Sequence, residues 1–376
     1  MANLGYLQLT RDCRQHCRFC SNPPSGVDLD ADEMIRVLDD LVERAYDGVI
    51  LTGGEPTIAP LLVRAVDAAH ARGLHVRMIT NGQRLAEEGF LRELVDAGLS
   101  HVHLSLHSSR PAVHDYLTQT PGAFGMIDAA LGHIGRLGIA GRTITSDINT
   151  VINANNSDHL DETVRWVVAT HPHVRHFVWN NMDPNMNRAE KNPDVIPRLE
   201  EFEVSLRRAM EYLHGTGRTF RAERVPLCYM PRFAWASTET RKIVKEEERC
   251  IRFLDRKGFV LQRQFLHGKS AACDACPLDP VCAGLYSMGY HYDAAELFPV
   301  AGDPVAVIRD VLRREPDPAL VERILARRGL RSDEQPDDHG LRRAGGGTVG
   351  ENPQAAASAS VIHPGRTGTI PLPRAP

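Results

Sequence analysis

Cysteines are the residues of this sequence with the clearest capacity for chemistry. The chain of 376 residues contains eight, grouped in two clusters with two single positions between them. They are Cys13, Cys17, Cys20, Cys228, Cys250, Cys273, Cys276 and Cys282. Reduced cysteines that stand in clusters indicate metal ligation or catalysis rather than disulfide bonds.

The first cluster is a CxxxCxxC run from Cys13 to Cys20, directly after a predicted strand. Three thiolates can hold three irons of a 4Fe–4S cube. Because no fourth cysteine lies nearby, one iron would be open to a ligand that is not protein. The alternative is a structural zinc site, which needs four ligands and would recruit His16.

The second cluster contains CxxC, five further residues and then Cys-x-Gly, from Cys273 to Gly284. Four thiolates suit a structural zinc ion as well as an iron–sulfur cube, and composition does not separate the two. With Cys228 and Cys250 added, five cysteines saturate one cube and cannot saturate two. The sequence does not rank these two single cysteines as ligands.

Short apolar runs alternate with longer amphipathic segments from Leu4 to about Phe177. The runs predict strands at Gly5–Leu9, Gly48–Leu51, His75–Ile79, His101–Leu106, Thr143–Ile152 and Val174–Trp179. The amphipathic segments predict helices at Ala31–Arg44, Leu61–Arg72 and, beyond the last strand, Arg198–His214. This alternation implies a parallel sheet, open or closed into a barrel.

Regular periodicity fades between Arg221 and about Pro299, where five cysteines occur. This pattern predicts a small, loop-rich domain held together by metal. Two short helices are expected at Pro304–Arg314 and Pro318–Arg328. From Ser332 onward Gly, Ala, Pro, Ser and Arg dominate, which predicts a disordered tail.

Charge and hydropathy exclude several classes of protein. Lys plus Arg number 44 and Asp plus Glu number 48, which gives a net charge of −4. This charge argues against a protein that binds mainly to nucleic acid or to an anionic membrane. No apolar run approaches the ~18 residues of a spanning helix. Met1–Gly5 lacks the features of a secretory signal. We therefore expect a soluble cytoplasmic protein with neither nucleic-acid nor membrane partner.

The CxxxCxxC run resembles the signature of radical S-adenosylmethionine (SAM) enzymes. Phe19 precedes the third cysteine, as an aromatic residue does in that family. Leu51–Thr57 contains Gly-Gly-Glu-Pro after the second strand, and Thr80–Gly82 and Leu104–His107 also look like the family. The match covers roughly residues 4–215. It implies an α/β fold, a partial (β/α)6 TIM-type barrel with its site at the C-terminal ends of the strands.

The resemblance also implies the binding of SAM. Cys13, Cys17 and Cys20 would hold three irons of a 4Fe–4S cluster, whose open iron takes the amino and carboxylate groups of SAM. Further candidate contacts are Gly53, Gly54, Glu55, Ser105, His107, Asn149 and Asn153. The alternative for Ser105 and His107 is that they are polar residues whose hydrogen bonds are satisfied within the protein at a strand end. The amides of the asparagine-rich stretch Trp179–Asn187 could contact the adenine of SAM or a polar substrate. Alternatively, they could stabilise the turns of the stretch itself.

The CxxC-x5-C core resembles the SPASM and twitch extensions that carry auxiliary 4Fe–4S clusters. It departs from the full SPASM pattern, because Tyr286 stands four residues after Cys282 and no cysteine follows. One auxiliary cluster is expected. The predicted parts are thus a radical SAM barrel (1–215), an auxiliary-cluster domain (216–300), a helical extension (301–331) and the tail (332–376).

By this resemblance the chain is an enzyme that cleaves SAM reductively to a 5′-deoxyadenosyl radical, which removes a substrate hydrogen. We expect it to crosslink, oxidise or epimerise a peptide or natural-product precursor, with flavodoxin or ferredoxin as electron donor. The first strand begins at about Leu4, so no N-terminal peptide-recognition domain is expected, which favours a small substrate, a short peptide or a separate recognition protein. One alternative is a dehydrogenase or epimerase of a sugar or antibiotic precursor. Another is a non-catalytic zinc or iron–sulfur protein.

Overall fold

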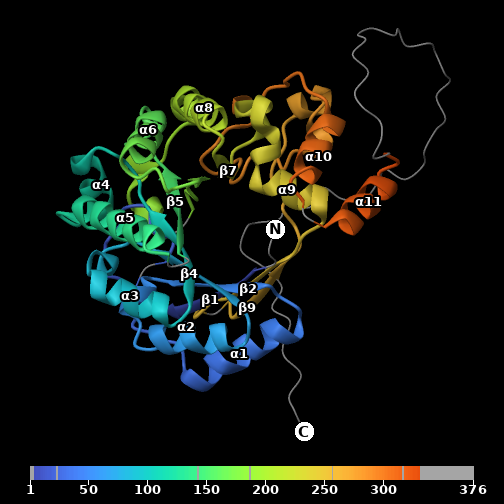
Figure 1. Ribbon diagram of the computed structural model, residues 1–376. Helices are drawn as coiled ribbons and strands as arrows, with labels where there is room; N and C mark the ends of the chain where they lie inside the picture. The colour runs from blue at the N-terminus through green and yellow to red at the C-terminus, as the bar shows by residue number, and fades with distance from the viewer. Residues whose placement is uncertain are drawn as a thin grey trace, which may run out of the picture. The chain divides into compact units, whose positions relative to one another are not determined.

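The computed structural model describes residues 4–330, except 23, 142–143, 186–187, 256 and 316 (Figure 1). The predicted tail 332–376, and Thr143 at the start of the fifth predicted strand, lie outside the described residues. The strands are β1 (Leu4–Thr10), β2 (Gly48–Gly53), β3 (His75–Thr80), β4 (Leu99–Ser105), β5 (Thr145–Ile152), β6 (His176–Asn181), β7 (Thr219–Glu223), β8 (Arg249–Arg252) and β9 (Phe259–Gln262). The six predicted strands are confirmed as β1 to β6, with small shifts at their ends.

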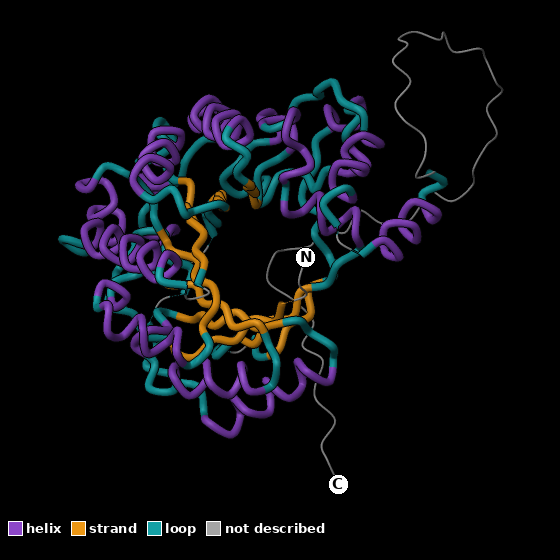
Figure 2. The backbone as a smooth tube through the Cα atoms, in the orientation of Figure 1, coloured by secondary structure: helices purple, strands orange, loops and turns teal. Residues whose placement is uncertain are grey.

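All the strands belong to one sheet, with the order β7-β6-β5-β4-β3-β2-β1-β8-β9. Strands β1 to β7 pair in parallel with their neighbours, β8 is parallel to β1, and β9 is antiparallel to β8. The two edge strands, β7 and β9, do not pair with each other, so the sheet is open. Figure 2 shows the helices on the outer side of these strands. This arrangement confirms the predicted partial TIM-type barrel.

The helices follow the strands in the manner expected of βαβ units. They are α1 (Ala31–Glu43), α2 (Leu62–Ala71), α3 (Glu88–Asp96), α4 (Pro111–Thr118), α5 (Ala123–Ile139), α6 (Leu160–Thr170), α7 (Arg188–Lys191), α8 (Leu199–Gly215), α9 (Thr238–Lys245), α10 (Pro304–Leu312) and α11 (Pro318–Arg327). Helix α1 begins at Ala31 because the Asp30 carboxylate accepts hydrogen bonds from the N–H groups of Asp32 and Glu33, both at 3.0 Å. Gly73 and Gly98 both have positive φ just after helices α2 and α3, the backbone conformation in which many helices end.

The hydrophobic core lies between the sheet and the helices that cover it. Leu7, Val49, Leu51, Val76 and Met78 have no exposed surface. They alternate along β1, β2 and β3 with residues that point to the interior of the barrel, as the two-residue period of a strand requires. The helices bury matching apolar faces.

Three strands of the sheet were not predicted. Strands β7, β8 and β9 fall within residues 216–300, the segment expected to form a separate loop-rich domain. The sheet therefore continues past residue 215, and the compact unit that holds the barrel extends to just before Asp317. A second unit begins there and contains α11, whose first turn is capped by the Asp317 carboxylate.

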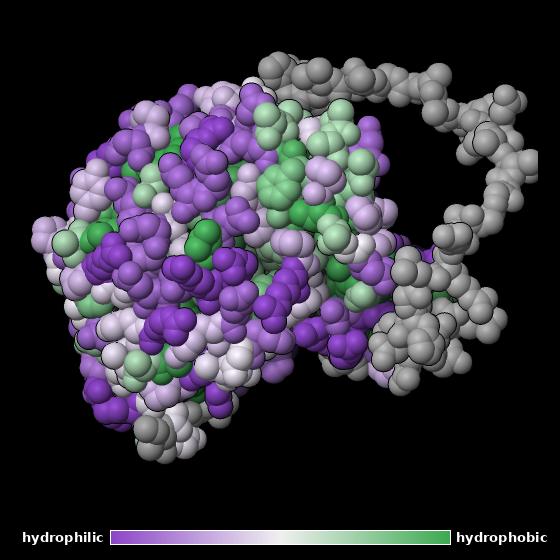
Figure 3. Space-filling model, turned by 90° about the horizontal axis from the view of Figure 1, so that it is seen from above, coloured by the Kyte–Doolittle hydropathy of each residue, from purple (hydrophilic) through white to green (hydrophobic). Residues whose placement is uncertain are grey.

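The face seen in Figure 3 is largely hydrophilic, with apolar side chains scattered between polar ones. Within the described part of the chain, none of the helices has the length and hydrophobicity needed to cross a bilayer.

Candidate functional site

The loop with the first three cysteines begins where β1 ends, at the carboxyl edge of the sheet. It is joined there to the loop after β2, since the N–H of Gly54 donates to Thr10 O and that of Glu55 to Asp12 O, both at 2.8 Å. A Cβ on Gly53 would lie 2.1 Å from Thr10 O, and one on Gly54 would lie 2.2 Å from Asp12 O. Both glycines are thus required by the contact between the two loops, a role that the sequence did not predict.

The fold brings the three thiols of this loop within electrostatic reach of one another. Burial raises the pKa of Cys13 to about 11, assisted by the nearby Glu55 carboxylate and the Cys20 thiol. Burial, followed by Cys20 and Cys13, raises the pKa of Cys17 still further. Three thiolates are therefore unfavourable here without a cation among them, and an iron–sulfur cluster supplies one.

Neighbouring groups support negative charge on these sulfurs. The N–H of Gln15 donates to Cys13 Sγ, and that of Asn22 donates to Cys20 Sγ, both at 3.3 Å. Asn81, which follows β3, directs its Nδ2 at Cys13 Sγ from 3.8 Å. Donors aimed at sulfur favour the thiolate form that metal ligation requires.

Glu55 links the loops after β2 and β3. Its side chain is buried, and Oε1 accepts from Thr57 N at 3.0 Å, Thr57 Oγ1 at 2.7 Å and Thr80 Oγ1 at 2.6 Å. Oε2 accepts from Asn81 N at 2.7 Å. Burial raises the pKa of Glu55 although each of these hydrogen bonds acts in the opposite direction. Glu55 therefore holds together the two loops that lie beside the cysteine loop.

His107 and Phe19 meet beside the cysteine loop. The His107 ring is only 4% exposed; Phe19 packs edge-on against it at 4.8 Å, and His114 stacks on it at 5.6 Å. Its Nδ1 accepts a hydrogen bond from Val151 N at 3.3 Å, and burial lowers its pKa well below the ordinary value. The structure thus gives His107 a packing role, and its contact with SAM stays a prediction.

Of the remaining predicted contacts, Ser105 ends β4, Asn149 lies within β5 and Asn153 directly follows β5. Ser105 and Asn149 are register partners on β4 and β5, and Asn180 Nδ2 donates to Asn149 Oδ1. Asn153 is fully buried and makes its own turn, donating to Val151 O at 2.9 Å. Asn153 therefore supports the loop rather than presenting its amide to a ligand.

The asparagine-rich stretch Trp179–Asn187 begins within β6 and contacts Tyr286 and Tyr292 further along the chain. Asn181 Oδ1 accepts from Tyr292 Oη at 3.2 Å, and Asp183 Oδ2 accepts from Tyr286 Oη at 2.7 Å. Tyr286, which occupies the position where the full SPASM pattern differs, thus holds this loop. The last two residues of the predicted stretch lie outside the described residues.

Arg188 is a site residue that sequence reasoning missed. On α7, it donates from Nη1 to Cys17 O at 3.4 Å, and its Nη2 lies 3.2 Å from His16 Nδ1. Its positive charge opposes the rise in the pKa of Cys13 and Cys17. No local motif marks this arginine, because only the tertiary fold brings α7 over a loop near the N-terminus.

Cys228, Cys273 and Cys282 come together in the C-terminal part of the barrel unit. Burial raises the pKa of Cys228 to about 12, and the thiols of Cys282 and Cys273 add to this rise. Burial also raises the pKa of Cys282, with Cys273 contributing. Cys276 follows Cys273 through a turn in which Cys276 N donates to Cys273 O at 2.9 Å.

Gly284 explains the Cys-x-Gly element of the second cluster. Its φ is +90°, and a Cβ there would lie 2.3 Å from Gly268 O. The same turn lets Gly284 N donate to Cys282 Sγ at 3.3 Å. Glycine is needed here for a close backbone approach and a donor aimed at sulfur.

Cys250 lies apart from this group. It is on β8, 3% exposed, and the groups acting on its thiol are Asp40, Arg44 and Tyr46 rather than another cysteine. Burial raises the pKa of Cys250 to about 11. The structure therefore gathers four of the five downstream cysteines into one region and places the fifth beside β1.

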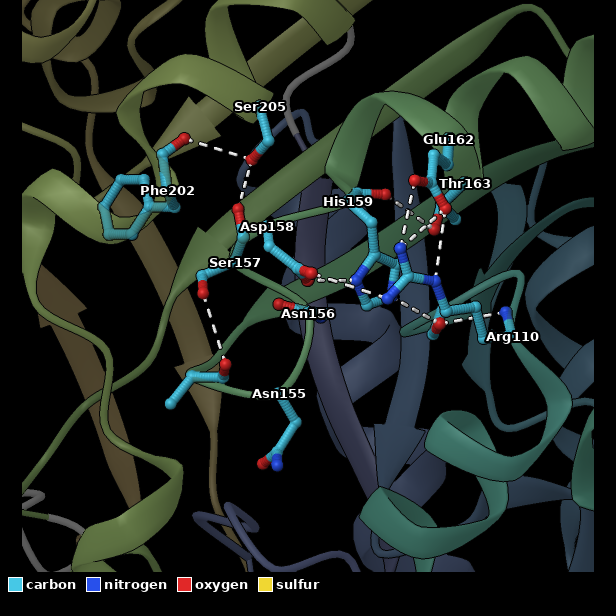
Figure 4. Close-up of polar contacts among 12 residues, drawn as sticks. Arg110, Asn155, Asn156, Ser157, Asp158, His159, Glu162, Thr163, Phe202 and Ser205 are labelled. Atoms are coloured by element: carbon cyan, nitrogen blue, oxygen red, sulfur yellow. Dashed lines mark hydrogen bonds and ion pairs between the residues drawn. The ribbon is translucent and has the colours of Figure 1, made fainter.

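A second polar cluster has the geometry of a hydrolase triad. His159 Nε2 lies 2.8 Å from Ser108 Oγ. Figure 4 shows His159 beside Asp158, whose carboxylate is in contact with His159 Nδ1. Ser108 and His159 have no exposed surface, so no substrate reaches the hydroxyl. These contacts, with the ion pair of Arg110 and Glu162 at 2.9 Å, fasten the loop before α6 to the loop before α4.

Comparison with known proteins places this geometry in a family. Residues 7–167 match the sequence model of the Radical SAM superfamily. The chain is 31% identical over 223 residues to the PqqA peptide cyclase of Rhodopseudomonas palustris, covering 56% of this chain and 55% of that protein. It is 31% identical over 165 residues to the PqqA peptide cyclase of Ruegeria pomeroyi, covering 43% and 42%. The chain spans about half the length of the curated relatives it matches.

Solved structures share the fold at low identity. Streptococcus suis SuiB bound to S-adenosylmethionine aligns with a TM-score of 0.54 and 14% identity, over 80% of this chain and 77% of SuiB. Native anSMEcpe with bound AdoMet and Cp18Cys peptide aligns with a TM-score of 0.55 and 12% identity, over 86% and 99%. The matched segment contains all three cysteines of the first cluster and the Gly-Gly-Glu turn. Residues 7–167, which hold these motifs, therefore form a domain of the Radical SAM superfamily.

Proposed function

We propose that this protein is a radical SAM enzyme that modifies a peptide by hydrogen abstraction. The observation that carries the proposal is the gathering of three cysteine thiols at the carboxyl end of β1, on a loop held by the Gly-Gly-Glu turn. Radical SAM chemistry requires such a three-cysteine site at this edge of a partial barrel.

Cys13, Cys17 and Cys20 would hold the SAM-binding 4Fe–4S cluster. When bound, the cluster and SAM supply an electron transfer that releases methionine and a 5′-deoxyadenosyl radical able to take hydrogen from an unactivated carbon. The chain keeps the three sulfurs in place through Gln15, Asn22 and Glu55. Arg188 places a positive charge beside sulfurs that carry negative charge when they ligate iron.

Cys228, Cys273, Cys276 and Cys282 would hold one auxiliary 4Fe–4S cluster. The thiols of Cys282 and Cys273 add to the rise in the pKa of Cys228, and Cys273 also adds to that of Cys282. Cys276 belongs to the same CxxC element as Cys273. Four thiolates saturate a cube, so this cluster would have no open iron for SAM. Cys250, which neighbours Tyr46 instead, is not part of the proposed set.

A peptide substrate is supported by the relatives named as peptide cyclases and by the likeness to structures solved with peptides. A reducing partner such as flavodoxin or ferredoxin would supply the electron. Ser105 on β4 and Asn149 on β5 would contact SAM, and Asn180 on β6, which donates to Asn149, would face the substrate. Their part in the reaction is to hold SAM and the substrate in place and to exclude water.

The test is SAM cleavage by the full chain. Protein reconstituted anaerobically with iron and sulfide, then reduced with dithionite in the presence of SAM, should release 5′-deoxyadenosine, measured by liquid chromatography and mass spectrometry. Cys17→Ala should abolish release, because the cluster loses one of its three protein ligands.

Cys250→Ala is the matched control, since it also removes a buried thiol but one outside both proposed sites. It should retain cleavage close to that of the unaltered protein. Release of 5′-deoxyadenosine by the Cys17→Ala protein, or its absence from the unaltered protein with full iron content, would refute the proposal.

A further inference from the structure

The interior of the barrel contains polar groups that radical SAM chemistry leaves unexplained. A cavity of about 470 Å³ is lined by residues of β1 to β8, among them His101, His103, Asp147 and His176. These four lie on β4, β5 and β6, in the first part or the middle of their strands. The cysteine loop follows the opposite, carboxyl end of β1.

Strand register places these side chains next to one another. His103 on β4 pairs with Asp147 on β5, which in turn pairs with His176 on β6. His101 precedes His103 by two residues and therefore faces the same side of the sheet. The rings of His101 and His103 are 4.5 Å apart and edge-on.

Two imidazole nitrogens converge on one carboxylate oxygen. His101 Nε2 lies 3.0 Å from Asp147 Oδ2, and His103 Nδ1 lies 3.3 Å from the same oxygen. One ligand atom from each of the three residues can be chosen so that all lie within 4.8 Å of one another. Ligands bound at about 2.1 Å around a tetrahedral metal are separated by about 3.4 Å, so these spacings suit a shared ion.

The orientation of His101 is fixed from outside the cluster. Its Nδ1 lies 2.7 Å from Thr145 Oγ1, and the Thr145 hydroxyl is placed to donate to Ser100 O at 3.4 Å. A hydroxyl that donates there accepts from the N–H at Nδ1, which leaves the lone pair on Nε2. That lone pair faces Asp147, an arrangement that is favourable when a cation lies between them. Metal-binding histidines are commonly held through their other nitrogen in this way.

Burial of these side chains favours the binding of a metal ion, whereas the positive charges that line the cavity disfavour it. The side chains of His101, His103 and Asp147 are 13%, 16% and 10% exposed, so the cluster is largely desolvated yet open to the cavity. Arg77 and Arg221 also line the cavity, and their positive charges oppose a cation. The carboxylate of Asp147 is nevertheless the charge in direct contact with both imidazoles.

We propose that His101, His103 and Asp147 form a binding site for a divalent first-row transition-metal ion such as Zn²⁺, separate from both cysteine sites. Two imidazoles and one carboxylate form a donor set that such ions favour. Three protein ligands leave coordination positions open toward the cavity, where His176 is the next potential donor.

Zinc bound to the reconstituted, full-length protein tests this site. After anaerobic reconstitution fills the cysteine sites with iron, the protein is incubated with Zn²⁺, desalted and analysed for metals by mass spectrometry. About one zinc per chain should remain beyond the iron, as one three-ligand site would hold. Crystals of the same preparation should give an anomalous peak at the zinc edge between the His101, His103 and Asp147 side chains.

Asp147→Asn keeps the shape of the side chain and removes its charge. Its affinity for Zn²⁺ should fall more than about 100-fold, since loss of even an indirect supporting partner commonly costs 10- to 100-fold. Asp128→Asn is the matched control, because it alters another carboxylate paired with a histidine, at 2.7 Å from His171 Nε2. It should leave zinc binding unchanged.

The anomalous map of the unaltered protein decides the matter even where Asp147→Asn fails to fold. A zinc peak only at cysteine sulfurs, or no peak in the barrel interior, overturns the proposal. Equal zinc affinity in the unaltered and Asp147→Asn proteins overturns it as well.

Discussion

At the scale of single residues, spacing in the sequence identified side chains whose role is set by neighbours close along the chain. Cys13, Cys17 and Cys20 share one short loop, so their association was predictable. The role of Arg188 was not predictable, because its contact with the Cys17 carbonyl depends on how α7, which is distant in the sequence, packs against the cysteine loop. Glu55 was predicted only as a contact of SAM, and its partners at the end of β3 and on the loop that follows emerge only from the fold.

The two single cysteines give a residue-scale prediction that the sequence left open. Cys228→Ala should remove about four irons per chain, the content of one 4Fe–4S cube, because Cys228 lies with Cys273 and Cys282. Cys250→Ala should leave the iron content unchanged, because its thiol is beside Tyr46. Iron and sulfide analysis after reconstitution measures both. Loss of iron in the Cys250→Ala protein alone would reverse the assignment.

At the scale of elements, the strands that were predicted are β1 to β6, in which buried apolar residues recur over six to eight positions. These strands pack against helices on their outer side, which requires an apolar residue at about every second position. Strands β8 and β9 have four residues each, and β8 reads Arg-Cys-Ile-Arg. Strand β7 alternates polar and apolar residues beside charged ones. Short strands with charged ends lack the apolar pattern from which strands are predicted. Their place in the sheet depends on pairing with strands that are distant in the sequence.

The contact between the loops after β1 and β2 gives an element-scale prediction. Gly54→Ala would bring a Cβ within 2.2 Å of Asp12 O and push the cysteine loop away from the Gly-Gly-Glu turn. We expect a loss of about 1–3 kcal/mol in the free energy of unfolding, as in overpacked sites. Iron should be lost from the first cluster, with 5′-deoxyadenosine release reduced accordingly.

Gly89→Ala provides the matched control for this change. Gly89 lies in α3, where an added Cβ would meet nothing within 4 Å. The substitution should leave stability equal or raised by up to about 1 kcal/mol, since alanine favours a helix. Denaturant unfolding and iron analysis compare the two proteins, and equal behaviour would show that the two loops tolerate separation.

At the scale of the whole molecule, the two cysteine sites occupy one continuous barrel unit and draw on different parts of it. The first depends on β1 and the loops after β2 and β3. The second depends on turns between Cys228 and Gly284. The predicted division into parts assigned the two cysteine clusters to different segments of the chain. It could not show that β7, β8 and β9 extend the same sheet, because sheet order is not written in local composition.

Their independence gives a prediction for the whole protein. Replacing Cys13, Cys17 and Cys20 together with Ala should leave a brown protein whose iron falls from about eight to about four atoms per chain. Its remaining absorption should not respond to SAM, because four thiolates leave no open iron. Replacing Cys273 and Cys276 should spare SAM binding while blocking product formation. A colourless, zinc-loaded triple variant would contradict an auxiliary iron–sulfur cluster.

The position of β1 between β2 and β8 has a consequence for how the chain matures. The strand that leads into the cysteine loop is made well before its second neighbour, which lies more than two hundred residues later. Pairings so distant in sequence form slowly, and an open strand edge invites association with other chains in the meantime. A fragment ending at residue 215 would keep every motif of the first site and leave β1 permanently without β8. Assembly of the iron-binding end of the barrel is thus tied to completion of the chain well beyond the motifs themselves.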